Sequence, residues 1–236
     1  MTISLKSPDA GLATRSLNSG ANSALGGLTN VSLSEYSIRY QLAVYSVDDS
    51  GITLAVEPQT VTMSDTGNAS FSLSLVPNLS YKFVAWADFV TAGSTSDLHY
   101  DTSDFTNITV LDGTSAQLND ESRDAYYVSH EETVTGDLSL NLTLTRPFAK
   151  LRVVTNDYDT DGITYPDAVS VSYYGGARFT SLNAVTGEVS GETLADSGTT
   201  AYTGTLSTDK EYSTGLDADA SYRTLVVDYL LADADE

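Results

Sequence analysis

Cysteine is absent from the 236 residues, so the chain holds no disulfide, thiolate metal site or cysteine nucleophile. Cations are also scarce: 11 Lys and Arg stand against 32 Asp and Glu, a formal net charge of −21. This balance argues against binding to nucleic acid or to an anionic membrane surface, because both attract clustered cations. No apolar run is long enough to span a bilayer, and residues 1–3 do not open a signal peptide.

The residues that are abundant favour strands and turns. Hydrophobic residues make up 41% of the chain, 15 residues are Tyr, and Ser and Thr are frequent throughout. Thr and Tyr are enriched in β-strands, whereas Ser and Gly favour turns. We therefore predict an all-β protein. Its low Lys content and its Ser/Thr/Asn/Gly loops favour an exported protein over a cytosolic one.

Period-two alternation predicts most of the strands. Apolar residues alternate with Ser in 70–75, whereas 79–88 is apolar on both faces and is predicted to be a central, doubly covered strand. The predicted strands are 2–5, 36–44, 52–57, 70–75, 79–88, 138–145, 149–153, 168–174, 177–182, 200–206 and 223–231.

Other segments carry different signals. Residues 11–34 are rich in Gly, Ser and Asn and are predicted to be a mobile loop, and 91–118 are predicted to be irregular. Residues 119–127 resemble a short helix that Asn119 or Asp120 would cap. An acidic run ending in Gly162 suggests a domain boundary. We predict two immunoglobulin-like β-sandwich domains, residues 1–155 and 156–236.

Searches for catalytic signatures find none. The chain has no Gly-x-Ser-x-Gly, Walker A, Gly-x-Gly-x-x-Gly or Cys-x-x-Cys motif. His130-Glu131 begins a zinc-protease motif, but Val134 stands where the second His is needed and the segment is not helical. His99 and His130 are therefore predicted to be loop residues. Nothing singles out two of the 32 acids as a glycosidase pair, and we predict a protein without enzymatic activity.

Basic and aromatic residues have structural interpretations. Arg146, Lys150 and Arg152 share a strand face with Phe148 and are predicted to form a solvated face that neutralises nearby carboxylates. Trp86 lies on the doubly apolar strand with Tyr81 and is predicted to be a core residue and not a sugar platform.

One acidic loop is a candidate metal site. Asp157, Asp159 and Asp161 precede Gly162 in a D-x-D-x-D-G pattern, which resembles the first half of a calcium loop. Ala168 stands where the loop's bidentate Glu would be, so the pattern is not an EF-hand. The alternative is an Asp/Gly turn without a metal. Apart from this calcium ion, no cofactor is expected.

Four segments resemble the fimbrillin-like surface proteins of Bacteroidales-type bacteria. Their order and spacing fit that family over about residues 36–190. They are Phe83-Val84-Ala85-Trp86-Ala87-Asp88-Phe89, Asp97-Leu98-His99-Tyr100 with Asp104, Arg123-Asp124-Ala125-Tyr126-Tyr127, and Leu144-Thr145-Arg146-Pro147-Phe148-Ala149-Lys150-Leu151.

The resemblance implies two transthyretin-like sandwiches in a fimbrial (pilus) subunit or related adhesin at the cell surface. It implies a lipoprotein of the outer membrane, attached through a lipid on a Cys upstream of Met1. In polymerising relatives a protease cuts after an Arg in the N-terminal loop, and a donor strand from another subunit then replaces the first strand. Arg15-Ser16 matches that position. The alternatives are an incidental loop Arg and a non-polymerising surface module that binds glycans or host proteins. The family continues beyond the 225–230 strand, so the second sandwich is expected to lack strands.

The acidic loop generates a direct test. If it binds calcium, added Ca²⁺ raises the thermal midpoint and a chelator lowers it, because a ligand of the folded state stabilises that state. The double substitution Asp157→Asn and Asp159→Asn removes this response in a thermal melt, whereas Asp49→Asn in a different acidic turn keeps it. A midpoint that ignores both calcium and chelator would leave only the turn interpretation.

Overall fold

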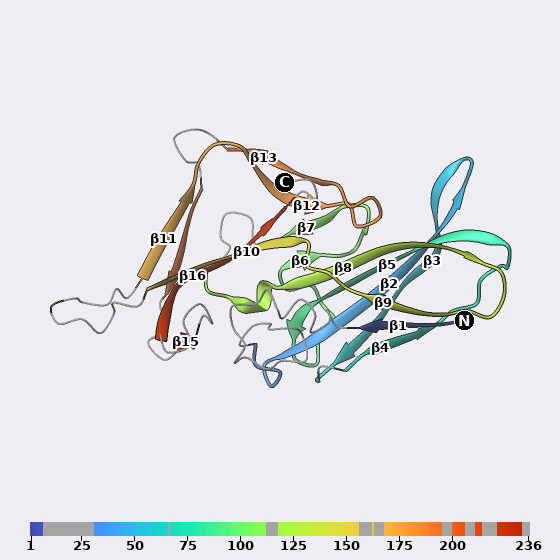
Figure 1. Ribbon diagram of the computed structural model, residues 1–236, viewed down its shortest axis with the longest axis horizontal. Coiled ribbons are helices and arrows are strands. Elements are labelled where there is room, and N and C mark those ends of the chain that lie inside the picture. Colours follow the sequence, from blue (N-terminus) through green and yellow to red (C-terminus); the bar gives the residue numbers. More distant parts are fainter. Residues whose placement is uncertain are drawn as a thin grey trace.

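The computed structural model describes residues 1–6, 31–65, 67–111, 118–155, 162, 168–194, 200–205, 211–213 and 221–232. It is nearly all β, which confirms the predicted class (Figure 1). The strands are β1 Thr2–Lys6, β2 Tyr36–Asp48, β3 Gly51–Met63, β4 Ala69–Ser72, β5 Leu79–Thr91, β6 Tyr100–Asp101, β7 Ile108–Val110, β8 Ala125–Val134, β9 Ser139–Thr143, β10 Phe148–Thr155, β11 Ala168–Tyr173, β12 Ala177–Leu182, β13 Val189–Thr193, β14 Thr200–Thr205, β15 Glu211–Ser213 and β16 Ser221–Leu231.

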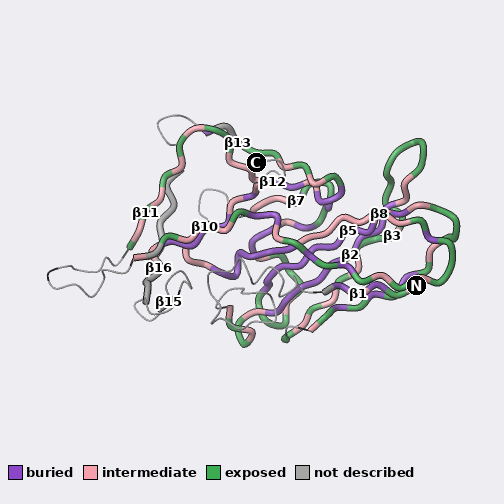
Figure 2. Tube along the Cα trace, in the orientation of Figure 1, coloured by how far each residue is buried: buried purple, intermediate pink, exposed green. Residues whose placement is uncertain are grey.

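A four-stranded antiparallel sheet in the order β3-β2-β5-β8 forms the middle of the molecule. Its inner strands β2 and β5 are buried along most of their length on both faces (Figure 2). This confirms the predicted central position of residues 79–88. On β2, Arg39, Gln41 and Ala43 alternate with Ile38, Tyr40 and Leu42, and the residues of both faces are buried.

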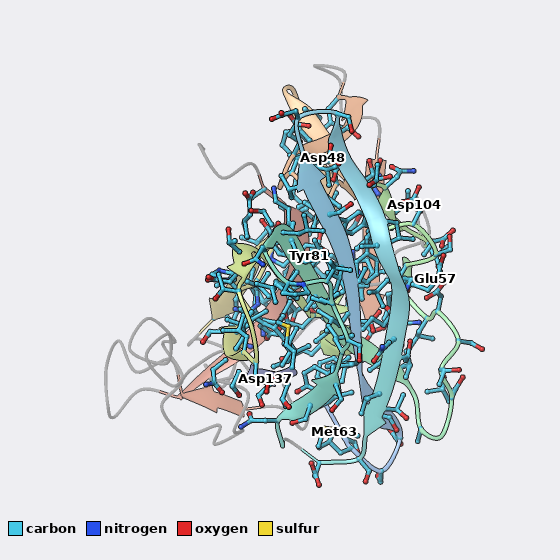
Figure 3. All side chains as sticks on the ribbon, turned by 90° about the vertical axis from the view of Figure 1, so that its right-hand side faces the viewer. Asp48, Glu57, Met63, Tyr81, Asp104 and Asp137 are labelled. Atoms are coloured by element: carbon cyan, nitrogen blue, oxygen red, sulfur yellow. The ribbon has the colours of Figure 1, made fainter. Side chains whose placement is uncertain are left out.

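One face of the middle sheet packs on the three-stranded sheet β4-β1-β9. Residues of β2 and β5 such as Tyr40, Leu42 and Phe83 form this core together with Ile3 and Leu5 of β1. Figure 3, which views the end where the N-terminus lies, shows Tyr81 among the core side chains and Asp48 and Glu57 at the periphery.

The other face packs on a larger sheet with the strand order β10-β16-β12-β7-β6, to which β13 and β15 add. Trp86 lies in this second core, fully buried, with its ring 5.3 Å from that of Tyr100 in a T-shaped contact. Its predicted core position is confirmed. Two cores therefore lie on opposite faces of one middle sheet, which makes a three-layer stack.

The larger sheet contains strands from both sides of the predicted boundary at residue 155. β10 pairs with β16 along its whole length, and β12 pairs with β7. The division between residues 1–155 and 156–236 therefore does not separate two sheets. The remaining pair, β11 and β14, forms a two-stranded antiparallel ribbon.

Two local expectations were wrong. The predicted helix at 119–127 is a single 3-10 turn, η3 at Glu121–Arg123, capped by the Asp120 side chain as expected. β8 begins at Ala125, because Tyr126 and Tyr127 pair with Ala87 and Trp86 of β5 and strand pairing overrides the local acidic signal. The segment 91–118, predicted to be irregular, contains the short strands β6 and β7.

Among the described residues, no helix has the length and apolar character required to cross a bilayer.

The buried tyrosines predict alkaline lability. Burial, with Asp65 nearby, raises the pKa of Tyr40 to about 12. Burial also raises the pKa of Tyr126 and Tyr229 well above the ordinary value. The unfolded chain then loses these protons first, near pH 10, so stability is complete below pH 10 and is lost as pH rises toward the folded-state pKa. The expected slope is about 1.4 kcal/mol per pH unit for each such tyrosine.

Urea unfolding followed by Trp86 fluorescence between pH 8 and 12 measures this slope. Tyr40→Phe should make it shallower by about one tyrosine's share, while Tyr174→Phe, on an exposed side chain, leaves it unchanged. A wild-type slope in Tyr40→Phe would contradict the role of Tyr40.

Candidate functional site

The N-terminal strand β1 is the middle strand of its sheet. It runs antiparallel to β4, with Ile3 opposite Phe71, and parallel to β9, with Ile3 opposite Leu140. In the part of the chain that the structure describes, β4 and β9 pair with no strand other than β1. Removing β1 would therefore leave one unpaired backbone edge on each of them, facing a common groove.

Additional hydrogen bonds hold the start of β1. The Thr2 amide donates to the Leu138 carbonyl at 3.0 Å, and the Leu73 amide donates to the Met1 carbonyl at 3.1 Å. The Met1 ammonium donates to the Leu73 carbonyl at 3.2 Å. The backbone of the first residues is thus bonded on both sides, as in an ordinary inner strand.

Side chains of β1 alternate between the core and the surface. Ile3 and Leu5 are 0% exposed and point into the first core, whereas Thr2 is exposed and Ser4 half-buried. Burying one such aliphatic side chain contributes about 1.5–3 kcal/mol. The groove between β4 and β9 therefore has two apolar positions that accept residues in an i, i+2 pattern.

The outer face of this sheet carries hydroxyl and amide groups. Its described side chains are Thr2, Ser4, Ser70, Ser72, Ser139, Asn141 and Thr143. Ser4 Oγ lies 3.5 Å from Ser70 Oγ on the neighbouring strand. A chain with a net charge of −21 thus presents no carboxylate on the three strands of this sheet.

An inner strand with these properties is what strand exchange requires. Open backbone edges supply affinity, and apolar pockets for alternate side chains supply specificity. Arg15 and Ser16, the predicted cleavage site, lie in the connection between β1 and β2 but outside the described residues. Their interpretation stays a prediction.

The acidic loop with Asp157, Asp159 and Asp161 also lies outside the described residues, so calcium binding there stays a prediction. Within the described ranges, no group of three or more His, Asp or Glu side chains is arranged to hold a metal ion.

The predicted basic cluster does meet carboxylates, but these are buried. Arg146 donates two hydrogen bonds, each of 2.7 Å, to Asp124, which is 0% exposed. Lys150 and Arg152 lie 3.2 and 3.5 Å from the two oxygens of buried Glu121. Burial lowers the pKa of Lys150, and Glu121 opposes that shift. The cluster is therefore only partly solvated, contrary to the predicted solvated face.

More buried ion pairs join distant elements, and none of these pairs was predicted from the sequence. Arg123 of η3 donates to Asp228 of β16 at 2.6 Å, and Tyr173 of β11 donates to the same carboxylate at 2.8 Å. In the middle sheet, Arg39 binds Asp88 with two hydrogen bonds and Asp97 with one. The available signal was an acid inside an apolar strand, such as Asp228 in 225–231, because a buried charge needs a partner.

The two histidines lie in different settings. His99 lies in a loop, as predicted, and is buried, with Nε2 at 2.8 Å from Ser122 Oγ and 3.5 Å from Asp120. His130 was predicted to lie in a loop, which is wrong: it belongs to β8, where it pairs with Phe83. The His130-Glu131 segment is extended and not helical. This agrees with the sequence argument against a zinc-protease motif there.

The fold and the groove define an all-β protein of three packed sheets whose N-terminal strand completes an outer sheet. The chain belongs to a family of unknown function (DUF6562), whose model matches residues 1–236. No curated protein matches it.

The structural role of β1 gives a stability prediction. Leu5→Ala should cost about 2–5 kcal/mol, because it leaves a cavity in the first core. The matched control Ser4→Ala, on the opposite face of the same strand, should stay within about 0.5 kcal/mol of the wild type. Urea unfolding measures both free energies. A Leu5→Ala effect as small as that of Ser4→Ala would mean that β1 contributes little to the folded core.

Proposed function

We propose that this protein is a non-enzymatic surface-assembly subunit, a fimbrial subunit or fimbrillin-like adhesin, that joins other subunits through the groove of β1. The observation that carries the proposal is the inner position of β1, with Ile3 and Leu5 buried between β4 and β9. A strand supplied by a neighbouring subunit has the same backbone edges and the same two apolar positions available once β1 leaves. The resemblance of four segments to fimbrillin-like proteins supports this proposal.

Cleavage at Arg15 supplies the step that empties the groove. While β1 is covalently attached, its return to the groove is intramolecular and is favoured by a high effective concentration. A cut between Arg15 and Ser16 removes that advantage. The fragment is then held by two aliphatic side chains, together about 3–6 kcal/mol, and by its backbone hydrogen bonds, each with a net contribution of about 0.5–1.5 kcal/mol. Binding on this scale is replaceable by a longer donor strand.

The remaining parts of the proposal rest on the sequence. Attachment to the outer membrane through an upstream lipid follows from the resemblance, and the net charge of −21 suits a surface protein. Partner subunits are the proposed ligands of the groove. Host proteins or glycans are the ligands of the alternative, a surface module that does not polymerise.

An arginine-specific protease tests the proposal more sharply than trypsin, because trypsin also recognises Lys6 at the end of β1. The cut protein should release the fragment 1–15 and form larger species, detected by mass spectrometry and light scattering. Arg15→Lys is the matched control, since it keeps the charge and removes the cleavage site. A synthetic peptide with the sequence of residues 1–15, added in excess, should slow the assembly by refilling the groove.

Assembly that proceeds equally in Arg15→Lys would place the active cut elsewhere. Cleavage at Arg15 with the fragment retained and no larger species would contradict the polymerising function and favour the non-polymerising module.

A further inference from the structure

The connection between β1 and the rest of the fold is long relative to the strand that it carries. β1 has five residues, and residues 7–35 separate it from β2. Residues 31–35 are folded against the middle sheet, where the Glu35 amide donates to the Ser32 carbonyl, so residues 7–30 set the reach, at most about 80 Å when fully extended. This contour length exceeds the ~30 Å diameter of a small domain, so β1 can reach the groove of another copy without being cut.

We propose that intact β1 exchanges between copies of this chain: β1 of one copy docks between β4 and β9 of a second copy, in the register seen within one copy. The occupant is thus the unchanged segment Thr2–Lys6 of an identical chain. This proposal uses the same groove as the proposed function but requires neither cleavage at Arg15 nor a different donor strand.

The energetics of such an exchange are nearly neutral. Ile3 and Leu5 enter identical pockets in either arrangement, and the pairing with Phe71 and Leu140 is the same. Only the connection and the entropy of association differ, which is why swapping an identical element is a low-cost route to oligomers. Intramolecular docking profits from an effective concentration in the millimolar range. Exchange therefore becomes appreciable where copies are crowded, as on a surface.

Charge decides where two copies can approach. Each chain carries a net charge of −21, so two copies repel each other at low ionic strength. The strands around the groove carry no carboxylate, and their outer face presents hydroxyl and amide groups such as Ser4, Ser70 and Asn141. Salt screens the repulsion between the exposed charges elsewhere, with a Debye length of about 10 Å at 0.1 M. Exchange should therefore increase with ionic strength.

Order of synthesis favours exchange as well. β1 is made first, but its parallel partner β9 ends only at Thr143. The groove is incomplete until most of the chain exists, so β1 waits for it unpaired. During that interval another copy whose own β1 has not yet docked offers a competing site.

The absence of cysteine makes the exchange measurable. Ser4 Oγ and Ser70 Oγ lie 3.5 Å apart on paired strands, so cysteines at these positions are placed for a disulfide. We expect a doubly substituted Ser4→Cys, Ser70→Cys chain to close an intrachain bond, which verifies the pair. The test itself mixes two singly substituted chains, Ser4→Cys and Ser70→Cys, one of them with a mass tag, during refolding without protease.

Exchange predicts a covalent heterodimer between the two single variants under mild oxidation, seen on a non-reducing gel. Its yield should rise several-fold with protein concentration and with salt. The matched control mixes Ser4→Cys with Thr53→Cys, an exposed position on β3 of the middle sheet, and reports random collisions. Adding Leu5→Asp to the Ser4→Cys chain should reduce the heterodimer to that control level, because a carboxylate cannot enter the apolar pocket.

A heterodimer yield equal to the Thr53→Cys control, at high concentration and high salt, would overturn the exchange. Because no cleavage is involved, that outcome leaves the Arg15 route intact. Conversely, a heterodimer that forms when both cysteine variants also carry Arg15→Lys supports the exchange, even if the protease experiment shows no assembly.

Discussion

The pairing of β2 with β5 is the constraint on which the rest of the structure depends. These two strands are buried on both faces, so each face needs its own covering layer. The larger sheet covers one face with strands that all follow residue 99, including β7, β12 and β16. The other face depends on a sheet of only three short strands, and β1 is the strand that joins them. The molecule therefore places its N-terminal strand over one of its two cores.

Five of the 11 Lys and Arg side chains lie beside buried carboxylates. Arg39, Arg123 and Arg146 each bind a buried carboxylate, and Lys150 and Arg152 both lie beside Glu121. A buried carboxylate without a partner would be very costly, so these acids fix the positions of the cations. The ion pairs also span sequence distance, since Arg123 and Asp228 tie η3 to the last described strand. Among the described residues, buried acids such as Asp88, Asp124 and Asp228 are thus paired even though the chain has a net charge of −21.

The sequence predicted the class of the fold and many strand positions because alternation is a local property. Residues 79–88 were recognisable as a central strand, since apolar residues occupy both faces. The three-layer stack was not predictable, because polar Arg39 and Gln41 on one face of β2 give no local sign of burial. Burial of Arg39 depends on Asp88 and Asp97, which a single strand pattern does not reveal. The helix expected at 119–127 failed for a similar reason: its acids resemble a helix start, but its tyrosines pair with β5.

The candidate groove was predictable only in part. The pattern of Thr2–Leu5 indicated a strand with two core residues, but β4 and β9 carry the same alternation of Ser, Thr or Asn with Leu or Phe. Local sequence cannot say which of these strands lies between the other two. That similarity has a physical consequence, because pockets that accept Ile and Leu at i and i+2 discriminate weakly between donors of this pattern. Specificity at such a groove must then come from tethering and from local concentration more than from the pockets. A subunit that assembles through it would be controlled by when its own first strand is released and by how closely its neighbours are held.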